Sequence, residues 1–141
     1  MDKTEDLLKR LNASHDLDSL SNYLDGIKKA LPDSTGTYLK KLLKEKDVTP
    51  SEVIKRSRIE RTYCYQIFNG RKKPGRDKLL AISLALSLTL EETQRLLGIA
   101  KEGVLYVKSR RDSIIIYAIN NKMSVLDTNF LLNQYEESEL K

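Results

Sequence analysis

Signals for the start of a helix recur along this 141-residue chain. Thr49-Pro50-Ser51-Glu52 and Thr89-Leu90-Glu91-Glu92 both fit the capping box, in which a hydroxyl and a carboxylate satisfy the free backbone amides at a helix start. Ser109-Arg110-Arg111-Asp112 and Ser124-Val125-Leu126-Asp127 follow a weaker version of the same pattern. The sequence therefore predicts an all-α fold, with helices over 37–46, 50–57, 61–69, 76–87, 90–100, 110–120 and 125–136.

Apolar residues mark an inner face on each of the five central helices. The helix over 76–87 is apolar on nearly every side, so we expect it to be the most buried. The other four helices and their connections supply the remaining inward positions, which are Leu39, Leu42, Leu43, Val53, Ile54, Ile59, Cys64, Ile67, Phe68, Leu96, Leu97 and Ile99. Together they predict a compact five-helix bundle over residues 37–101.

Helical appendages are expected on both sides of this bundle. In the N-terminal part, apolar residues repeat with coiled-coil-like spacing at Leu17, Leu20, Leu24, Ile27 and Leu31. This seam of about two heptads is too short for a free coiled coil, so we expect it to pack on the bundle or on a partner.

The C-terminal part predicts a helical hairpin with an apolar run over 114–119 that something must cover. We expect the bundle, and in part a second subunit, to cover it. The chain is thus divided into an N-terminal helical extension (1–36), a helix-turn-helix domain (37–101) and a C-terminal helical hairpin (102–141).

The segment 63–74, with the sequence YCYQIFNGRKKP, has the most informative composition. This segment predicts a short helix that ends at Gly70, followed by a basic strip that turns at Pro74. The capped helix over 50–57 stands just upstream. Two short helices joined by a tight turn, with a basic strip after the second, are the layout of a helix-turn-helix that reads DNA.

Positive charge is concentrated in the same part of the chain. Residues 37–101 carry 15 basic and 7 acidic side chains, a net charge of +8, whereas 1–36 and 102–141 carry −2 and −1. A basic surface of this kind suits the phosphates of nucleic acid. Lysine and arginine are also common on solvated helix surfaces, which is the plainer interpretation.

Residues 37–98 resemble the Cro/repressor-type (Xre-like) helix-turn-helix family, and the flanking segments resemble those of an extended bacterial subgroup. The stretch 48–74 carries the resemblance, with 59–70 as the recognition segment. The resemblance implies a five-helix domain whose third helix enters the major groove, and a sequence-specific transcriptional regulator.

Three positions depart from the family pattern. Where this chain has Pro50, the family often has a glutamine whose amide touches a backbone phosphate. Ile54 replaces a small residue, which predicts altered packing between the second and third helices. Arg58 stands where the turn normally has glycine, so it must take a left-handed conformation or build a different turn.

The third helix presents its polar residues on the side opposite its apolar ones. The residues that we expect to touch bases are Arg61, Thr62, Tyr65 and Gln66. Arginine suits this role because its guanidinium bridges guanine O6 and N7. The residues expected to touch phosphates are Thr49, Ser51, Asn69, Arg71, Lys72, Lys73 and Arg76.

The sequence contains no pattern that indicates an enzyme, a cofactor or a metal site. Cys64 is the single cysteine, and His15, the single histidine, lies in a polar segment. The longest apolar stretch, 79–90, is too short to cross a bilayer, and 1–10 lacks the apolar core of a signal peptide. We therefore expect a cytoplasmic protein without membrane contact.

Two functions remain open on this fold. The first is a DNA-binding regulator that acts as a homodimer on double-stranded DNA, because one recognition helix makes few contacts. The second is a protein-interaction module, such as an antitoxin-like or adaptor subunit, that binds a protein partner through its N- and C-terminal extensions. The departures at Pro50, Ile54 and Arg58 favour the second function, and the basic centre favours the first.

Overall fold

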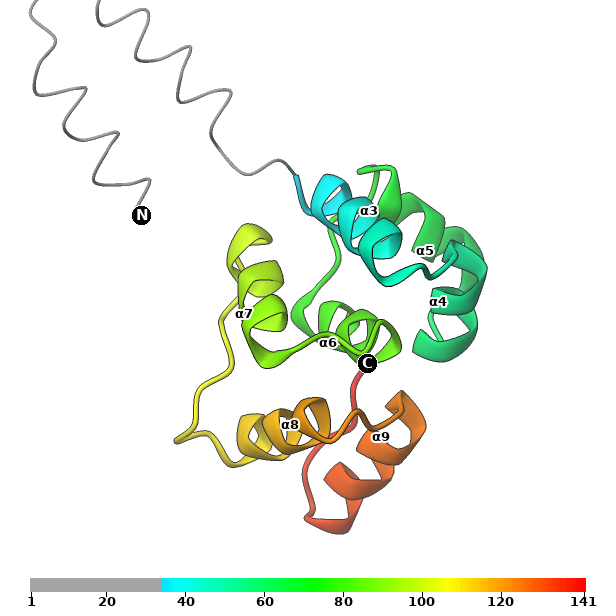
Figure 1. The fold of residues 1–141 in the computed structure, drawn as a ribbon. Helices are drawn as coiled ribbons and strands as arrows, with labels where there is room; N and C mark the ends of the chain where they lie inside the picture. The colour runs from blue at the N-terminus through cyan, green and yellow to red at the C-terminus, as the bar shows by residue number, and fades with distance from the viewer. Residues whose placement is uncertain (1–33) are drawn as a thin grey trace, which may run out of the picture. The chain divides into compact units, whose positions relative to one another are not determined.

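The computed structural model describes residues 34–141, which contain seven helices and no strand (Figure 1). The all-α prediction is confirmed for this part of the chain. The predicted N-terminal helix with its leucine seam lies outside the described residues. Residues 34–141 belong to one compact unit. The boundary predicted between 101 and 102 therefore lies inside that unit.

The helices follow the predicted ranges with ends that differ by at most two residues. They are α3 (Thr35–Lys46), α4 (Pro50–Ser57), α5 (Arg61–Phe68), α6 (Arg76–Ala85), α7 (Leu90–Ile99), α8 (Arg110–Asn120) and α9 (Val125–Gln134).

Side-chain caps explain why the helix starts were predictable. Both predicted capping boxes are present, at Thr49 before α4 and at Thr89 before α7. Ser109 and Ser124 cap α8 and α9 by accepting hydrogen bonds from the third backbone amide that follows each of them. Each cap satisfies an amide that has no partner within its own helix, so it fixes where that helix begins.

Helix α6 is the centre of the unit. Its residues from Leu79 to Ala85 are all buried, which confirms the prediction that this helix would be the most covered. It packs against α4 and α7, and also against α8 and α9. In Figure 1 it lies between the group α3–α5 and the hairpin α8–α9.

The C-terminal hairpin shares the core of the bundle. Ile115, Ile119 and Leu132 are at most 2% exposed and belong to the same buried cluster as the α6 leucines. The bundle therefore covers the inner face of the predicted apolar run. The outer face remains open, since Tyr117 is 58% exposed.

Gly36 lets the start of α3 approach the end of α5 closely. A Cβ atom at this position would lie 2.7 Å from the carbonyl oxygen of Phe68 and 3.2 Å from that of Ile67. We expect Gly36→Ala to lower the free energy of unfolding by about 1–3 kcal/mol, because a backbone carbonyl cannot rotate away as a side chain would. Urea denaturation should show a lower midpoint with an unchanged slope.

The matched control for this substitution is Gly98→Ala in α7, where a Cβ atom would meet nothing within 4 Å. Alanine is the better helix former by about 1 kcal/mol, so the control should be neutral or stabilising. Equal effects of the two substitutions would show that the α3–α5 approach is not tight.

Candidate nucleic-acid interface

Helices α4 and α5 pack against each other across a three-residue turn, Arg58, Ile59 and Glu60. Arg58 ends α4 with φ 63° and ψ 19°. Of the two predicted alternatives, a left-handed conformation or a different turn, Arg58 therefore adopts the left-handed conformation. Ile59 is buried, and its amide donates to the Ser57 hydroxyl at 3.3 Å. Ile54 is half-buried against the core. The turn is therefore held by core packing although it has no glycine.

The exposed face of α5 carries the predicted polar row. Arg61, Thr62 and Tyr65 are exposed, as is Asn69 just after the helix, and Gln66 is half-buried. Cys64, Ile67 and Phe68 point into the core on the other side. The Arg61 guanidinium lies 5.7 Å from the centre of the Tyr65 ring, so the two side chains are neighbours on this face.

Glu60 caps the start of α5. Its carboxylate accepts hydrogen bonds from the amides of Tyr63 and Thr62 at 2.9 and 3.0 Å. These hydrogen bonds, the one from Tyr63 foremost, hold the pKa of Glu60 below its usual value. The carboxylate therefore stays ionised beside the positive end of the helix dipole.

Residues 69–73 form a basic loop that folds back onto the end of α5. The Gln66 carbonyl accepts from the amides of Arg71 at 2.9 Å and Lys72 at 3.1 Å. Gly70 has φ 82°, a left-handed value that suits glycine at a helix end. The side chains of Arg71, Lys72 and Lys73 are exposed, and within residues 34–141 none of them forms an ion pair.

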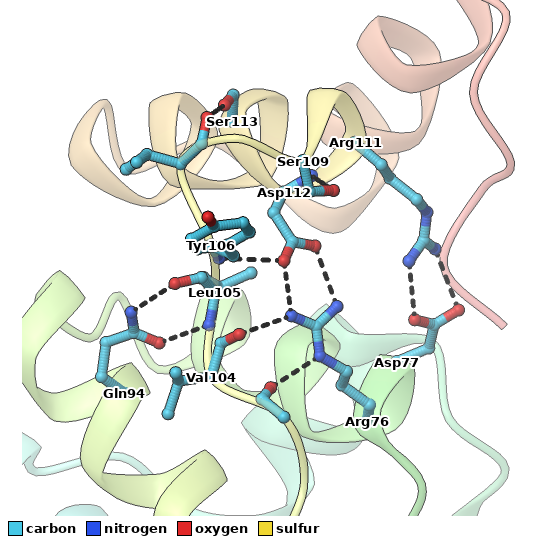
Figure 2. A network of polar contacts seen from close by, with 12 residues as sticks. Arg76, Asp77, Gln94, Val104, Leu105, Tyr106, Ser109, Arg111, Asp112 and Ser113 are labelled. Atoms are coloured by element: carbon cyan, nitrogen blue, oxygen red, sulfur yellow. Dashed lines mark hydrogen bonds and ion pairs between the residues drawn. The ribbon is translucent and has the colours of Figure 1, made fainter.

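Arg76 was predicted to contact phosphate, and the structure places its guanidinium elsewhere (Figure 2). Two of its nitrogens donate to the Asp112 carboxylate at 2.9 and 2.7 Å. The same side chain also donates to the carbonyls of Gly103 at 2.7 Å and Val104 at 3.1 Å. Four hydrogen bonds occupy the guanidinium, so we remove Arg76 from the candidate interface.

Thr49 and Ser51, the two remaining predicted phosphate contacts, lie at the start of α4. The Thr49 hydroxyl accepts from the Glu52 amide and donates to its carboxylate, both at 3.2 Å. This hydroxyl is therefore already committed to the cap. Ser51 is exposed on the first turn of the helix.

The network in Figure 2 joins α6 to the start of α8, and we did not predict it. Arg111 pairs with Asp77 through two hydrogen bonds of 3.1 and 3.0 Å, beside the Arg76–Asp112 pair. The Gln94 amide also exchanges two hydrogen bonds with the backbone of Leu105. Asp112 and its partner Arg76 stand 36 residues apart in the sequence.

The remaining chemistry of the described residues is sparse. Burial raises the pKa of the Cys64 thiol to about 11, which makes it a poor nucleophile. Residues 34–141 contain no group of His, Cys, Asp and Glu side chains that could hold a metal ion. In the same residues, no helix is long and apolar enough to span a bilayer.

Comparison of the chain with protein-family models, curated protein sequences and solved structures gives no match. What the protein does must therefore be inferred from the arrangement of its own residues.

Proposed function

We propose that residues 35–101 bind double-stranded DNA, and that the protein is a sequence-specific transcriptional regulator of the Xre-like helix-turn-helix type. The observation that carries the proposal is the position of the basic loop. Its three cations have no acidic partner among residues 34–141, and they directly follow the exposed polar face of α5. Unpaired cations beside a polar helix face suit a phosphate backbone and the groove next to it.

The two parts of this surface have different roles in the proposal. Arg61, Thr62, Tyr65 and Gln66 on α5 face the base edges, while the basic loop, which includes Asn69, contacts phosphates together with Ser51. Base contacts select the sequence, and phosphate contacts supply most of the affinity.

A homodimer is part of the same proposal. Helix α5 has only 8 residues, so a single copy reaches few base pairs. Two copies whose α5 helices lie about 34 Å apart, one turn of DNA, would read two half-sites together. Sedimentation of the full chain tests this, and a monomer at micromolar concentration on and off DNA would contradict the dimer.

A salt-titrated binding assay tests DNA binding itself. Duplex DNA from the promoter of the gene that encodes this chain is titrated at several salt concentrations. We expect the logarithm of the binding constant to fall linearly with the logarithm of salt concentration. Absence of binding at the lowest salt concentration would contradict the proposal.

Arg61→Ala is expected to weaken binding to the preferred site by about 1–3 kcal/mol and to relax the choice at one base pair. The reason is that arginine donates two hydrogen bonds to a guanine edge, which alanine cannot replace. Affinities for the preferred site and for a random duplex of equal length are compared.

Arg95→Ala is the matched control, because Arg95 also lies 5.7 Å from a tyrosine ring, that of Tyr38, but on α7. It should change neither affinity nor choice of sequence. If Arg61→Ala lowers both affinities equally, Arg61 contacts a phosphate, and another residue reads the sequence.

Exposed apolar side chains on the hairpin favour a second candidate function, a protein-interaction module. Leu126 and Phe130 on α9 are 60% and 74% exposed. Apolar side chains this accessible are typical of surfaces that bind another protein. Absence of DNA binding by the full chain at low salt would favour this second function.

A further inference from the structure

A cavity of about 390 Å³ opens beside the α4–α5 turn. It lies between this turn, α6, α9 and the segment that follows α9. Small-molecule sites commonly have volumes of about 300–1,000 Å³, so a compact organic ligand fits it.

The outer wall of this cavity is held by specific hydrogen bonds. The Leu140 amide donates to the Asn129 side-chain oxygen at 2.8 Å, and the Lys141 amide donates to Asp77 at 3.1 Å. Arg111 donates to the carbonyls of Ser138 and Glu139. In Figure 1 this segment runs back from α9 to end beside α6. One wall of the cavity is therefore an anchored segment.

The charged groups that line the cavity are mostly positive. Arg58, Lys78 and Lys141 line it, and Glu139 is the one acidic side chain among the lining residues. Within residues 34–141, Arg58 and Lys78 form no ion pair, and the Lys78 ammonium lies over the Tyr63 ring at 5.2 Å. The site therefore suits an anionic group.

Apolar side chains form another part of the lining. Leu126 and Phe130 line the cavity and remain largely exposed, and the buried Val125 and half-buried Leu140 also line it. Asn129 and Asn133 add amides that can orient a polar group. An occupant that covers the leucine and phenylalanine would remove apolar surface from water.

We propose that this cavity binds a small amphipathic anion. A carboxylate, sulfonate or phosphate group lies against Arg58 and Lys78, and an apolar body covers Leu126 and Phe130. Charge-assisted hydrogen bonds hold the head, and burial of apolar surface holds the body. This site does not require DNA binding, so the proposal of an anion site and the proposed function are tested independently.

The experiment titrates the full chain, without DNA, with 8-anilinonaphthalene-1-sulfonate, an aromatic anion that becomes fluorescent in apolar surroundings. Octanoate, an aliphatic anion, is added as a competitor. We expect one binding site per chain and displacement of the fluorescent probe by octanoate. Lys78→Gln should weaken probe binding about tenfold, the loss of one charge-assisted hydrogen bond. Phe130→Ala should weaken it about fivefold through lost apolar contact.

Two matched controls lie away from the cavity. Lys108→Gln removes an exposed cation, and Tyr106→Ala removes an aromatic ring that is 56% exposed. Both should bind the probe as the parent chain does. Equal losses in the controls, unchanged binding in Lys78→Gln and Phe130→Ala, or failure of both anions to bind at millimolar concentration would each overturn the proposal.

Discussion

Replacement of Asp112 by alanine is expected to lower the free energy of unfolding by about 2–4 kcal/mol. The Asp112 side chain is 8% exposed, and its carboxylate accepts two hydrogen bonds from Arg76 and one from the Tyr106 amide. Alanine leaves the Arg76 guanidinium, 24% exposed, without its counter-charge. A fully buried broken pair costs about 3–5 kcal/mol, and the remaining exposure of Arg76 lowers the expected value.

Asp127→Ala is the matched control for this prediction. Asp127 has the same position in α9 that Asp112 has in α8, three residues after a capping serine, but it is exposed. Its replacement should change stability by at most about 0.5 kcal/mol. Both variants are compared by urea denaturation. Equal losses would show that the Arg76–Asp112 pair contributes no more than a helix start does.

The same pair makes stability depend on pH. Burial alone would raise the pKa of Asp112, but hydrogen bonds from Arg76 and the Tyr106 amide, together with the charge of Arg76, outweigh it. The pKa in the folded protein therefore lies below the usual 3.8. The stabilisation is present above that usual value and is lost as the pH falls through the folded pKa. The loss of unfolding free energy that Asp112→Ala causes, relative to the parent chain, should accordingly be smaller in acid than at neutral pH.

Neutralising the basic loop is expected to have the largest effect on DNA binding. Glutamine at positions 71, 72 and 73 together should lower affinity by about 10²–10³-fold near 0.1 M salt. The slope of the salt dependence should fall by roughly one unit for each lost phosphate contact, because fewer counterions are released on binding. The loss should be similar for preferred and random duplexes, since phosphates carry no sequence.

The control for charge alone replaces Arg95, Lys108 and Arg110 with glutamine. All three are exposed and lie outside α4, α5 and the basic loop, and the change in net charge is the same. This variant should keep nearly the whole salt slope. If its slope falls as much as that of the loop variant, net charge attracts the DNA, and the loop is not the contact.

Local signals made the helices predictable, because a cap involves residues only three positions apart. Thr49 with Glu52, and Thr89 with Glu92, can be recognised from the sequence, and the structure contains both pairs. The exposed row of α5 followed from its apolar side, since Cys64, Ile67 and Phe68 determine which residues face away from the core.

The different surroundings of Arg71 and Arg76 could not be predicted in this way. The two arginines stand five residues apart, and each directly follows a glycine. Arg76 pairs with Asp112 across 36 residues, after the hairpin has folded onto α6. Only tertiary packing brings these two groups together, so no local pattern distinguishes Arg76 from Arg71. The cavity beside Arg58 could not be predicted for the same reason, because it also needs the hairpin in place.

Hydrogen bonds fix the backbone of the basic loop and of the chain after it, and this order affects the entropy change on binding. The Gln66 carbonyl holds the loop backbone at Arg71 and Lys72, and the guanidinium of Arg76 anchors the chain three residues after the loop ends. Its backbone is therefore already ordered before any anion arrives. Binding then loses little backbone conformational entropy, so more of the interaction energy remains as affinity. A partner of this loop should associate without the large heat-capacity decrease that accompanies folding on binding.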